Sequence, residues 1–339
     1  MRIVEFMGPD AAVPVPVRGD GGRERVIETL ARSLSALDEV ERVELIAQDG
    51  SELEGVLIHT VRFTRGMDPV RTLSEARQGL AKPLDCDILH VHHPALLPAA
   101  EFIRARKVVL THHGAITHTD NFRADGVTFV SQFLRRWMSQ ERPSDTAVRT
   151  AAIHNPVGKA SLALRQGRRH GLGFMGALEK QVKRVDIALG LAERLNIPLF
   201  LAGPCNSRFL EQTVLPRLGS GVQYLGELSG EARRIFFEGV ACMVCPNEAP
   251  EAFCLVAAEA MAVGTPVLGS RGGALPEVVE HGVSGYLCGS LDEYAEAYGR
   301  LDQLSPLSCA ASAVRRFSPA RIAGEYLAFF ESVLGQVRP

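Results

Sequence analysis

Short apolar segments alternate with longer segments of helical periodicity along the first half of the chain, and this alternation constrains the fold more than any other feature. In residues 22–37 the apolar side chains recur at the spacing of one helix face. Strands that alternate with helices in this way predict a parallel sheet joined by crossover helices. The expected strands are RIVEFMG (2–8), VELIAQ (43–48), VLIHTV (56–61), DILHVHH (87–93), KVVLTHH (107–113) and VTFVS (127–131).

A second alternating series begins after residues 155–171, a polar, basic and glycine-bearing segment that we interpret as the connection between two domains. Its arginines are expected to lie in a solvated loop, with a partner or membrane-surface contact as the less favoured alternative; they are Arg165, Arg168 and Arg169. The expected strands of the second series are GLGFMG (171–176), IPLFLAG (197–203), VQYLG (222–226), ACMVCP (241–246), TPVLGS (265–270) and SGYLC (284–288).

The fold class predicted by these two series is α/β, with two doubly wound, Rossmann-like domains that face a cleft. Ligands of such sheets bind outside the carboxyl ends of the strands. We expect an N-terminal domain at 1–157, a C-terminal domain at 158–318, and a closing helix within 319–339 that packs back on the N-terminal domain. A length of 339 residues agrees with two domains of roughly 150 residues each.

Composition excludes several classes of protein. The formal net charge of −2 argues against a general nucleic-acid-binding protein. No apolar run reaches the ~18 residues that a membrane-spanning helix needs, and the start, MRIVEFMGPD, does not have the pattern of a signal peptide. The seven cysteines are scattered through apolar segments, as expected of buried thiols in a reducing compartment. We therefore expect a cytoplasmic protein, without an indicated membrane contact.

The segment PEAFCLVAAEAMAVGTPVLG raises the question of function, because it carries two glutamates in a stretch that is otherwise apolar. Buried carboxylates require partners. We expect Glu251 in the loop after a buried strand, and Glu259 about a turn and a half into a helix that stops at Gly264. The two carboxylates would then lie on either side of the beginning of a helix.

The first amides of that helix are unpaired donors at the positive end of the helix dipole, an arrangement that suits a phosphate. They belong to Phe253, Cys254 and Leu255. Carboxylates on both sides of a phosphate would accept the hydroxyls of a nucleotide sugar, which has a ribose at one end and a hexose at the other. The alternative is structural: Glu251 caps the helix and Glu259 meets a buried basic partner. The spacing alone does not decide between them.

Taken together, the motifs resemble those of the family 4 retaining glycosyltransferases, which have the GT-B fold and an E-x(7)-E signature. The segment PEAFCLVAAEAMAVGTPV (250–267) follows that signature, and the resemblance covers nearly the whole chain. The other matching motifs, in the order of the family, are GDGGRERVIETLARSL, DILHVHHP, VVLTHHG, VSQFLRR, IHNPV, FMGALEKQVKRVDIALGLAERLNIPLFLAG and GGALPEVVEHGVSGYL.

The resemblance implies roles for the matching side chains. Glu251 would hydrogen-bond the hydroxyls of the donor sugar near the reacting centre, and Glu259 would hold the ribose hydroxyls. Lys183, in KRVD, would neutralise charge on the leaving diphosphate. His113, in THHG, would face the sugar.

The resemblance also implies contacts of the backbone with the donor. The amides at Phe253, Cys254 and Leu255 would touch the diphosphate or the sugar. The loop at Gly21 and Gly22 would approach the phosphate from the N-terminal domain, where glycine allows a close approach of the backbone.

Two positions depart from the family pattern. The family commonly has an arginine after the glycine that ends the first strand of the C-terminal domain, and here that residue is Ala177. Arg184 or Lys180 could supply the missing charge, and we include Arg184 among the expected donor-binding residues. The second departure is Cys254, where the family usually has glycine, and its side chain is expected to narrow the approach to the donor.

Histidines and cysteines offer other chemistry. HVHH, which contains His90, His92 and His93, could begin a metal site, but no matching downstream carboxylate pattern follows, so we expect no metal. Cys242 and Cys245 have the spacing of a zinc or redox pair, but positions i and i+3 of a strand point to opposite faces and no second pair exists. We expect buried strand thiols.

The function predicted from the sequence is that of a metal-independent retaining glycosyltransferase, with no cofactor besides its nucleotide-sugar co-substrate. It would transfer a sugar from a nucleotide-diphosphate sugar, UDP being the commonest choice in the family, to a hydroxyl or amine of a saccharide, a glycolipid or a natural product. Two rivals stay open: a nucleotide-sugar-binding relative without activity, and a metal-dependent hydrolase built on the histidines.

Overall fold

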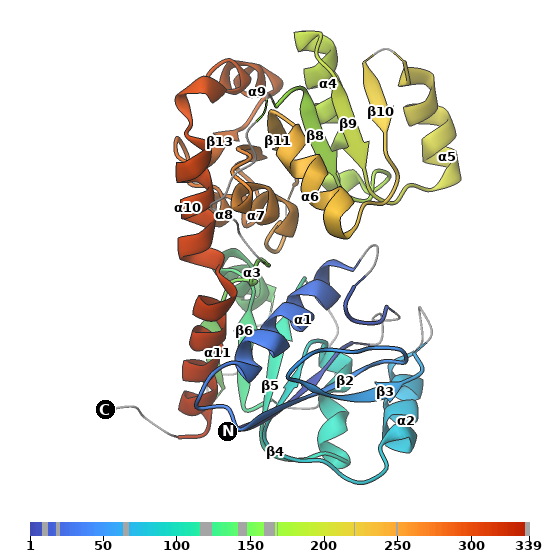
Figure 1. Cartoon of the computed structure of the whole chain (residues 1–339), viewed down its shortest axis with the longest axis vertical. Helices are drawn as coiled ribbons and strands as arrows, with labels where there is room; N and C mark the ends of the chain where they lie inside the picture. Colours follow the sequence, from blue (N-terminus) through green and yellow to red (C-terminus); the bar gives the residue numbers. More distant parts are fainter. Residues whose placement is uncertain are drawn as a thin grey trace. The chain divides into compact units, whose positions relative to one another are not determined.

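The computed structural model describes residues 1–8, 13–17, 21–63, 68–115, 124–141, 148–158, 167, 169–219, 221–248 and 250–335. The chain divides into two compact units: unit 1 comprises Met1–Pro156 and Pro319–Pro339, and unit 2 comprises Val157–Ser318. Each unit is built on one parallel sheet, of seven strands in unit 1 and six in unit 2 (Figure 1). The predicted fold class of two doubly wound α/β domains is confirmed.

In unit 1 the strand order is β3-β2-β1-β4-β5-β6-β7, and every neighbouring pair is parallel. The strands are β1 (Arg2–Phe6), β2 (Arg42–Gln48), β3 (Leu57–Val61), β4 (Asp85–Val91), β5 (Arg104–His112), β6 (Gly126–Phe129) and β7 (Arg149–Ala152). The helices are α1 (Gly22–Ser35), α2 (Pro69–Gly79), the 3₁₀ segment η1 (Pro94–Glu101), α3 (Gln132–Glu141) and α11 (Pro319–Val333). Six of the strands were expected, whereas β7 was not.

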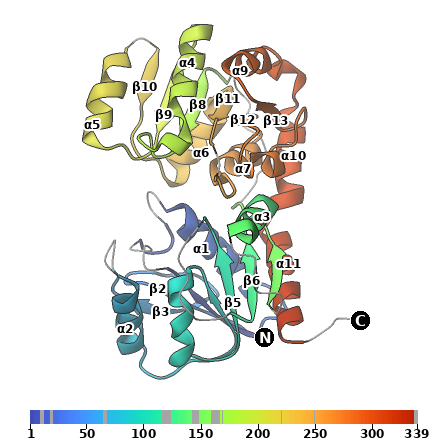
Figure 2. The ribbon, with the colours of Figure 1, turned by 180° about the vertical axis from the view of Figure 1, so that it is seen from behind.

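Helices cover both faces of the sheet in unit 1. On one face α1 and α11 share a buried core with β1 and β2, to which Leu30, Ile322 and Phe330 belong. At Gly126 a Cβ atom would lie 2.7 Å from a methyl group of Val333, so the missing side chain lets α11 approach β6. The other face is covered by α2 and η1, which are in view in Figure 2.

In unit 2 the strand order is β10-β9-β8-β11-β12-β13, again with parallel neighbours throughout. The strands are β8 (Leu172–Met175), β9 (Leu199–Ala202), β10 (Val222–Tyr224), β11 (Cys242–Cys245), β12 (Val267–Ser270) and β13 (Gly285–Cys288). The helical segments are η2 (Gln181–Lys183), α4 (Val185–Leu195), α5 (Ser207–Phe209), η3 (Leu210–Val214), η4 (Leu215–Arg217), α6 (Gly230–Gly239), α7 (Leu255–Ala262), α8 (Leu275–Val278), α9 (Leu291–Tyr298), η5 (Leu301–Gln303) and α10 (Pro306–Phe317).

The basic segment before β8 differs in part from the expectation. Arg165 and Arg168 lie outside the described residues. Arg169, in contrast, is not a solvated loop residue: its guanidinium donates to the carbonyls of Val263 and Gly264, at 2.8 and 2.6 Å. These carbonyls lie at the end of α7, where the last C=O groups of a helix lack partners, so Arg169 caps that helix.

Each strand order has one point at which the connections reverse direction. In unit 1 this switch lies between β1 and β4, and in unit 2 between β8 and β11. Side chains that follow neighbouring strands on the two sides of a switch flank an open crevice, which is where α/β sheets bind ligands. Of the described helices, none is both long and apolar enough to span a membrane.

Candidate functional site

The switch point of unit 2 brings together the loop after β8 and the loop after β11. The first loop runs from Gly176 to Lys183, and the second carries Asn247 and Glu251 before α7 begins at Leu255. Lys183 Nζ donates to Glu251 Oε2 at 2.6 Å. Two residues that are 68 positions apart in the sequence thus form one ion pair, at the edge of the sheet where a ligand is expected.

Glu251 has three partners in this structure. Besides Lys183, the amide of Asn247 donates to Oε2 at 2.6 Å, and the backbone N–H of Cys254 donates to Oε1 at 3.2 Å. Burial raises the pKa of Glu251, but Lys183 and Asn247 outweigh it and hold that pKa below its usual value. For Lys183, burial lowers the pKa and Glu251 more than restores it, so the net shift is upward. Both pKa shifts favour the charged forms, a carboxylate at Glu251 and an ammonium at Lys183.

The backbone of Glu251 is fixed as well as its side chain. The N–H of Ala274 donates to the carbonyl of Glu251 at 2.9 Å. At Gly273, φ is +61°, and a Cβ atom would lie 2.7 Å from that same carbonyl oxygen. The position therefore requires glycine for two reasons, its backbone conformation and the space available. This explains one glycine of the GGALPEV motif.

Glu259 lies on α7 and is paired with Arg233, which comes from α6. Two nitrogens of the Arg233 guanidinium donate to Glu259 Oε2, one of them, Nε, at 3.1 Å. The guanidinium also reaches Met175 Sδ, at the carboxyl end of β8. Both side chains are mostly buried, with 13% of Arg233 and 17% of Glu259 exposed. Sequence reasoning missed Arg233, because a helical arginine outside any motif has no distinguishing spacing.

The structure contains one contact that the structural alternative required and a close counterpart of the other. Glu259 has a basic partner, and Glu251 accepts from the amide of Cys254, the residue just before α7. The amide of Cys254 is consequently bound to Glu251, which corrects the expectation that it is an open donor for a phosphate. Each carboxylate nevertheless pairs with a cation that a diphosphate would attract. The contacts of the two glutamates are thus compatible with donor binding.

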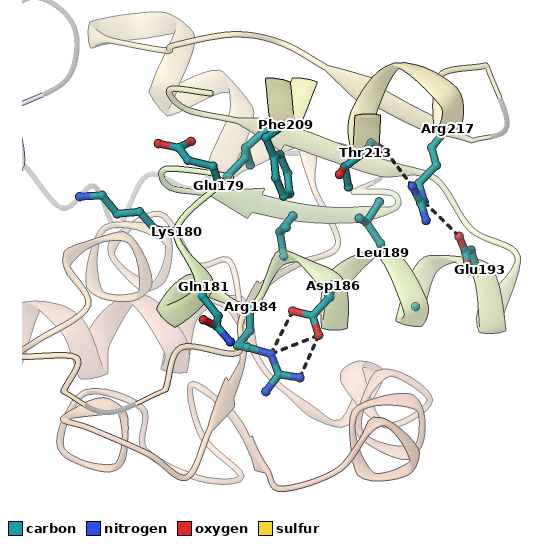
Figure 3. Close-up of a pocket in the computed structure, with 13 residues that line it drawn as sticks. Glu179, Lys180, Gln181, Arg184, Asp186, Leu189, Glu193, Phe209, Thr213 and Arg217 are labelled. Atoms are coloured by element: carbon teal, nitrogen blue, oxygen red, sulfur yellow. Dashed lines mark hydrogen bonds and ion pairs between the residues drawn. The ribbon is translucent and has the colours of Figure 1, made fainter. Parts of the chain in front are cut away.

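Arg184 and Lys180 were the expected replacements for the arginine missing at Ala177. The Arg184 guanidinium instead bonds Asp186 Oδ1 and Oδ2 at 2.9 and 2.8 Å, and also contacts Glu248. Two carboxylates therefore already neutralise its charge. Figure 3 shows Lys180 extending away from the Arg184–Asp186 pair. Arg233, in contrast, bonds Glu259 of the signature directly.

Figure 3 shows the pocket that Arg184 lines, between α4 and the helical segment Ser207–Arg217. Its volume is about 380 Å³. Two ion pairs lie on its wall, Arg184 with Asp186 and Arg217 with Glu193, and in the second Arg217 Nε lies 3.6 Å from the carboxylate. The pocket contains neither glutamate of the signature, and its paired charges do not identify a ligand.

In unit 1 the expected glycines lie at the beginning of α1. Gly21 is the N-cap residue and Gly22 the first residue of the helix. The next residue, Arg23, extends its guanidinium over Gly8, where a Cβ atom would lie only 3.2 Å from it. Gly8 follows β1, one of the two strands at the switch point. The N-terminus of α1 thus contributes a cation as well as two glycines to this edge of the sheet.

His113 directly follows β5, and it is partly exposed. Its Nε2 lies 2.9 Å from Nδ1 of His92, the residue that follows β4. Burial, then the charges of His92 and Arg23, lower the pKa of His113 well below its usual value. His113 is therefore a neutral imidazole at the edge of the sheet in unit 1.

The histidine motif gains a carboxylate that was not expected. Among the residues that the structure describes, Glu5, His90 and His92 form a group with the spacing of metal ligands. All three are buried, and hydrogen bonds of 2.6 to 3.1 Å already occupy both ring nitrogens of His90 and His92. A metal would have to replace these bonds. The set is better described as a buried hydrogen-bonded network.

The two cysteine expectations have different outcomes. Cys242 and Cys245 are buried free thiols on β11, as predicted. Cys254 does not narrow the approach to the site in the expected way, because only 6% of it is exposed and its thiol contacts that of Cys245. Its backbone is left-handed, with φ 69° and ψ 68°. An L-residue with a side chain rarely adopts that conformation.

Comparison with known proteins assigns the chain to a family. The sequence pattern described as Glycosyltransferase Family 4 matches residues 20–161, and the pattern described as Glycosyl transferases group 1 matches residues 169–303. The chain belongs to glycosyltransferase family 4. The resemblance seen in the motifs is confirmed, and with it the class of reaction, the transfer of a sugar from a nucleotide-sugar donor.

Individual known proteins differ in how much of the chain they match. The GDP-mannose-dependent alpha-mannosyltransferase of Corynebacterium glutamicum is 31% identical over 140 residues, a match that covers 40% of this chain and 32% of that enzyme. The solved structure of AviGT4, a glycosyltransferase involved in avilamycin A biosynthesis, superposes with a TM-score of 0.75 at 23% identity and covers 99% of both chains. Anabaena HepE in complex with UDP and glucose gives 0.70 at 18% identity, over 98% of this chain and 100% of HepE.

Proposed function

We propose that this family 4 glycosyltransferase is a retaining, metal-independent enzyme whose donor is a nucleoside-diphosphate sugar bound at the switch point of unit 2. The observation that carries the proposal is the pairing of two cations with two carboxylates there, Lys183 with Glu251 and Arg233 with Glu259. A donor of this kind carries negative charge at its centre and hydroxyl groups at both ends. Its charges and hydroxyls match the four side chains.

Donor binding would redistribute these pairs. The ammonium of Lys183 would move from Glu251 to the diphosphate, and the carboxylate would accept hydroxyls of the sugar. Arg233 and Glu259 would separate in the same way, with Glu259 accepting the hydroxyls of the ribose. Because each ion pair is replaced by charge-assisted hydrogen bonds to the ligand, the site would lose no favourable electrostatic contact.

The chemical step would need no nucleophile from the protein. The acceptor hydroxyl or amine would attack the anomeric carbon from the face that the diphosphate leaves, the bond from that carbon to the diphosphate oxygen would break, and this oxygen would take the acceptor's proton. Lys183 would stabilise the charge that develops on the diphosphate, and a cation fixed in advance reduces the barrier without reorganisation. Two protein cations beside the carboxylates are the reason to propose that no metal is required.

The remaining predicted residues have roles in the same proposal. The backbone at Phe253 and Leu255 would contact the diphosphate or the sugar, and Gly21 and Gly22 would allow α1 to approach the phosphate. His113 would contact the sugar. For the base, UDP is the first candidate because HepE binds UDP, although the corynebacterial relative uses GDP-mannose. The acceptor would be a saccharide, a glycolipid or a natural product.

The test is a thermal-shift panel of UDP, GDP, ADP, CDP and TDP with and without chelator, followed by transfer assays with the sugar donors of the best nucleotide. We expect one nucleotide to raise Tm equally with and without chelator. Glu259→Ala should weaken that nucleotide's binding by roughly 10- to 100-fold. A shift that requires metal would contradict metal independence. Binding without transfer to any acceptor would favour the inactive nucleotide-sugar-binding relative.

A further inference from the structure

A continuous chain of hydrogen bonds crosses the interior of unit 1 from α11 to His113. It links α11, β5, β4 and β1 and then returns to the carboxyl ends of β4 and β5. Its members, in order, are Tyr326, Thr111, His90, Glu5, His92 and His113. All except His113 are buried. Such a network has a direction, because each shared hydrogen belongs to one of the two groups that it joins.

The direction is set at Glu5. Its Oε2 lies 2.9 Å from Nδ1 of His90 and 2.7 Å from Nε2 of His92. Burial raises the pKa of Glu5, but the two imidazoles outweigh it and lower the pKa to about 2. The carboxylate is therefore ionised and can only accept, so both imidazoles donate to it.

The branch through His92 then determines the state of His113. The His92 ring is neutral, since burial and the neighbouring His90 lower its pKa to about 4. A neutral imidazole has one N–H, and His92 uses it at Nε2 to bond Glu5. Its Nδ1 must therefore accept, and the group 2.9 Å away is Nε2 of His113. His113 consequently carries its hydrogen on Nε2 and a lone pair on Nδ1.

The branch through His90 is consistent with this assignment. His90 donates from Nδ1 to Glu5, and its Nε2 lies 2.6 Å from the hydroxyl of Thr111, which can donate to that nitrogen or accept from it. Thr111 Oγ in turn lies 2.5 Å from the hydroxyl of Thr128 and 3.3 Å from that of Tyr326, either of which can donate to it. Because a hydroxyl can both donate and accept, no pair of donors or acceptors is left facing each other on this branch.

We propose that Glu5 and His92 are positioning residues that hold His113 as a hydrogen-bond acceptor at Nδ1, and that His113 accepts the hydrogen of a hydroxyl on the sugar substrate. The proposal rests on the proposed glycosyltransferase function. It specifies the ligand group: a hydroxyl can donate to this nitrogen, whereas a phosphate oxygen, a carboxylate or a carbonyl has no hydrogen to give. The charged and titratable groups around His113 are His92, Arg23, His90 and His112.

The first experiment records the imidazole nitrogen resonances of the full-length protein labelled with ¹⁵N-histidine, with the His113 signals assigned from a His113→Gln variant. The expected result is a neutral His113 with its hydrogen on Nε2. A hydrogen on Nδ1 would overturn the proposal. This measurement does not depend on catalysis, so it stands even if no donor sugar is transferred, an outcome that would count against the proposed function instead.

The second experiment compares Glu5→Gln with Glu44→Gln. Glu44 is also buried in unit 1 and pairs with a histidine, His59, at 2.6 Å, but it has no place in the chain that ends at His113. A glutamine at position 5 is neutral and carries an N–H₂ group beside its one oxygen, so the imidazoles lose the charged acceptor that orients them. We therefore expect His113 to lose its single hydrogen position and kcat/KM to fall about 3- to 10-fold. Glu44→Gln should change neither.

A panel of deoxy-sugar donors connects the two quantities measured above, the His113 resonances and kcat/KM. Removal of the hydroxyl that bonds His113 should cost the wild-type enzyme about 10-fold in kcat/KM and the Glu5→Gln enzyme much less, because residues that act together give non-additive effects. Equal losses in both enzymes at every deoxy position would overturn the proposal. So would a Glu5→Gln protein that keeps the wild-type His113 resonances.

Discussion

Lys183 Nζ lies 2.6 Å from Glu251 Oε2, and the two residues approach from the two sides of the switch point in unit 2. The pair joins the loop after β8 to the loop after β11. Because Lys183 is the cation and Glu251 the anion of one contact, a ligand that attracts one of them releases the other. A single pair thereby presents a positive and a negative group to a ligand that needs both.

Removal of Lys183 tests whether its charge acts on the leaving group. We expect Lys183→Ala to lower kcat by roughly 100-fold, the effect of losing one preorganised group that stabilises developing charge. Lys180→Ala is the matched control, since Lys180 is an exposed lysine three positions earlier and should leave kcat unchanged. Steady-state kinetics with a saturating donor would separate kcat from KM. An effect confined to KM would mean that Lys183 only binds the ground state.

Arg233 is the cation that the sequence motifs did not reveal. Arg233→Ala should weaken nucleotide-diphosphate binding by at least about 10-fold, because a hydrogen bond to a charged group contributes about 1.5–3 kcal/mol. Arg234→Ala is the control, since the neighbouring guanidinium bonds Glu231 and Glu238 on the same helix instead. Isothermal titration calorimetry would measure both. Tighter binding in Arg233→Ala would show that Arg233 competes with the ligand for Glu259.

Gly273 determines where the backbone of Glu251 can lie. We expect Gly273→Ala to destabilise the protein by at least about 2 kcal/mol, since the new methyl group would meet the Glu251 carbonyl at 2.7 Å and φ is +61°. Gly282 also has a positive φ, +79°, but nothing lies within 4 Å of the position of its Cβ. Gly282→Ala therefore isolates the backbone cost. If denaturant titrations gave both variants the same loss of unfolding free energy, close packing against Glu251 would not contribute to the cost of Gly273→Ala.

Cys254 allows a test of backbone strain at the signature. Glycine normally costs about 0.5–1 kcal/mol relative to alanine in regular structure. At φ 69° the order should reverse, because the left-handed conformation costs an L-residue roughly 1 kcal/mol or more. We expect Cys254→Gly to have a larger free energy of unfolding than Cys254→Ala by about 1 kcal/mol. Chemical denaturation of the two variants decides the point, and an alanine variant of equal or greater stability would refute it.

Glu5 should make the stability of the protein depend on pH under acidic conditions. Its pKa is about 2 in the folded protein and 4.5 for an ordinary glutamate, so the folded state binds fewer protons between these values. The contribution of Glu5 to the free energy of unfolding is therefore fully present above pH 4.5. It is lost as the pH is lowered toward 2, by about 3 kcal/mol in total. His92, lowered from 6.5 to about 4, acts in the same direction at higher pH.

The free energy of unfolding, measured from pH 7 to pH 2 for the wild type and Glu5→Gln, would test this. The variant should lose the contribution of Glu5 to the slope below pH 4.5, because glutamine does not titrate. An unchanged slope there would mean that other carboxylates account for acid unfolding.

The alternation of apolar and helical segments was sufficient to predict both sheets, because strands buried on both faces are continuous apolar runs. The strand β7 was missed because its residues, RTAA, are neither strongly apolar nor buried. The E-x(7)-E signature predicted Glu251 and Glu259 as neighbours of the helix start, but their partners depend on tertiary structure. Arg233 reaches Glu259 from another helix, 26 residues earlier in the chain.

Glu5 illustrates a signal that was present and unused. A carboxylate in the middle of RIVEF, an otherwise apolar strand, must find a partner in the core. The histidines of DILHVHH alternate at i and i+2, so His90 and His92 point to the same face of the neighbouring strand. What the sequence does not contain is the register of β1 with β4, which sets Glu5 opposite His90.

The helix α11 completes unit 1 although it follows unit 2 in the chain. Ile322, Tyr326 and Phe330 are almost fully buried in the core that includes α1. During synthesis all residues of unit 2 are added to the chain before those of α11, while the apolar face that α11 covers on unit 1 remains open. Domains usually fold in the order of their synthesis. In this chain unit 1 cannot complete its core until α11 is available, so the order of synthesis does not give the order in which the two units finish folding.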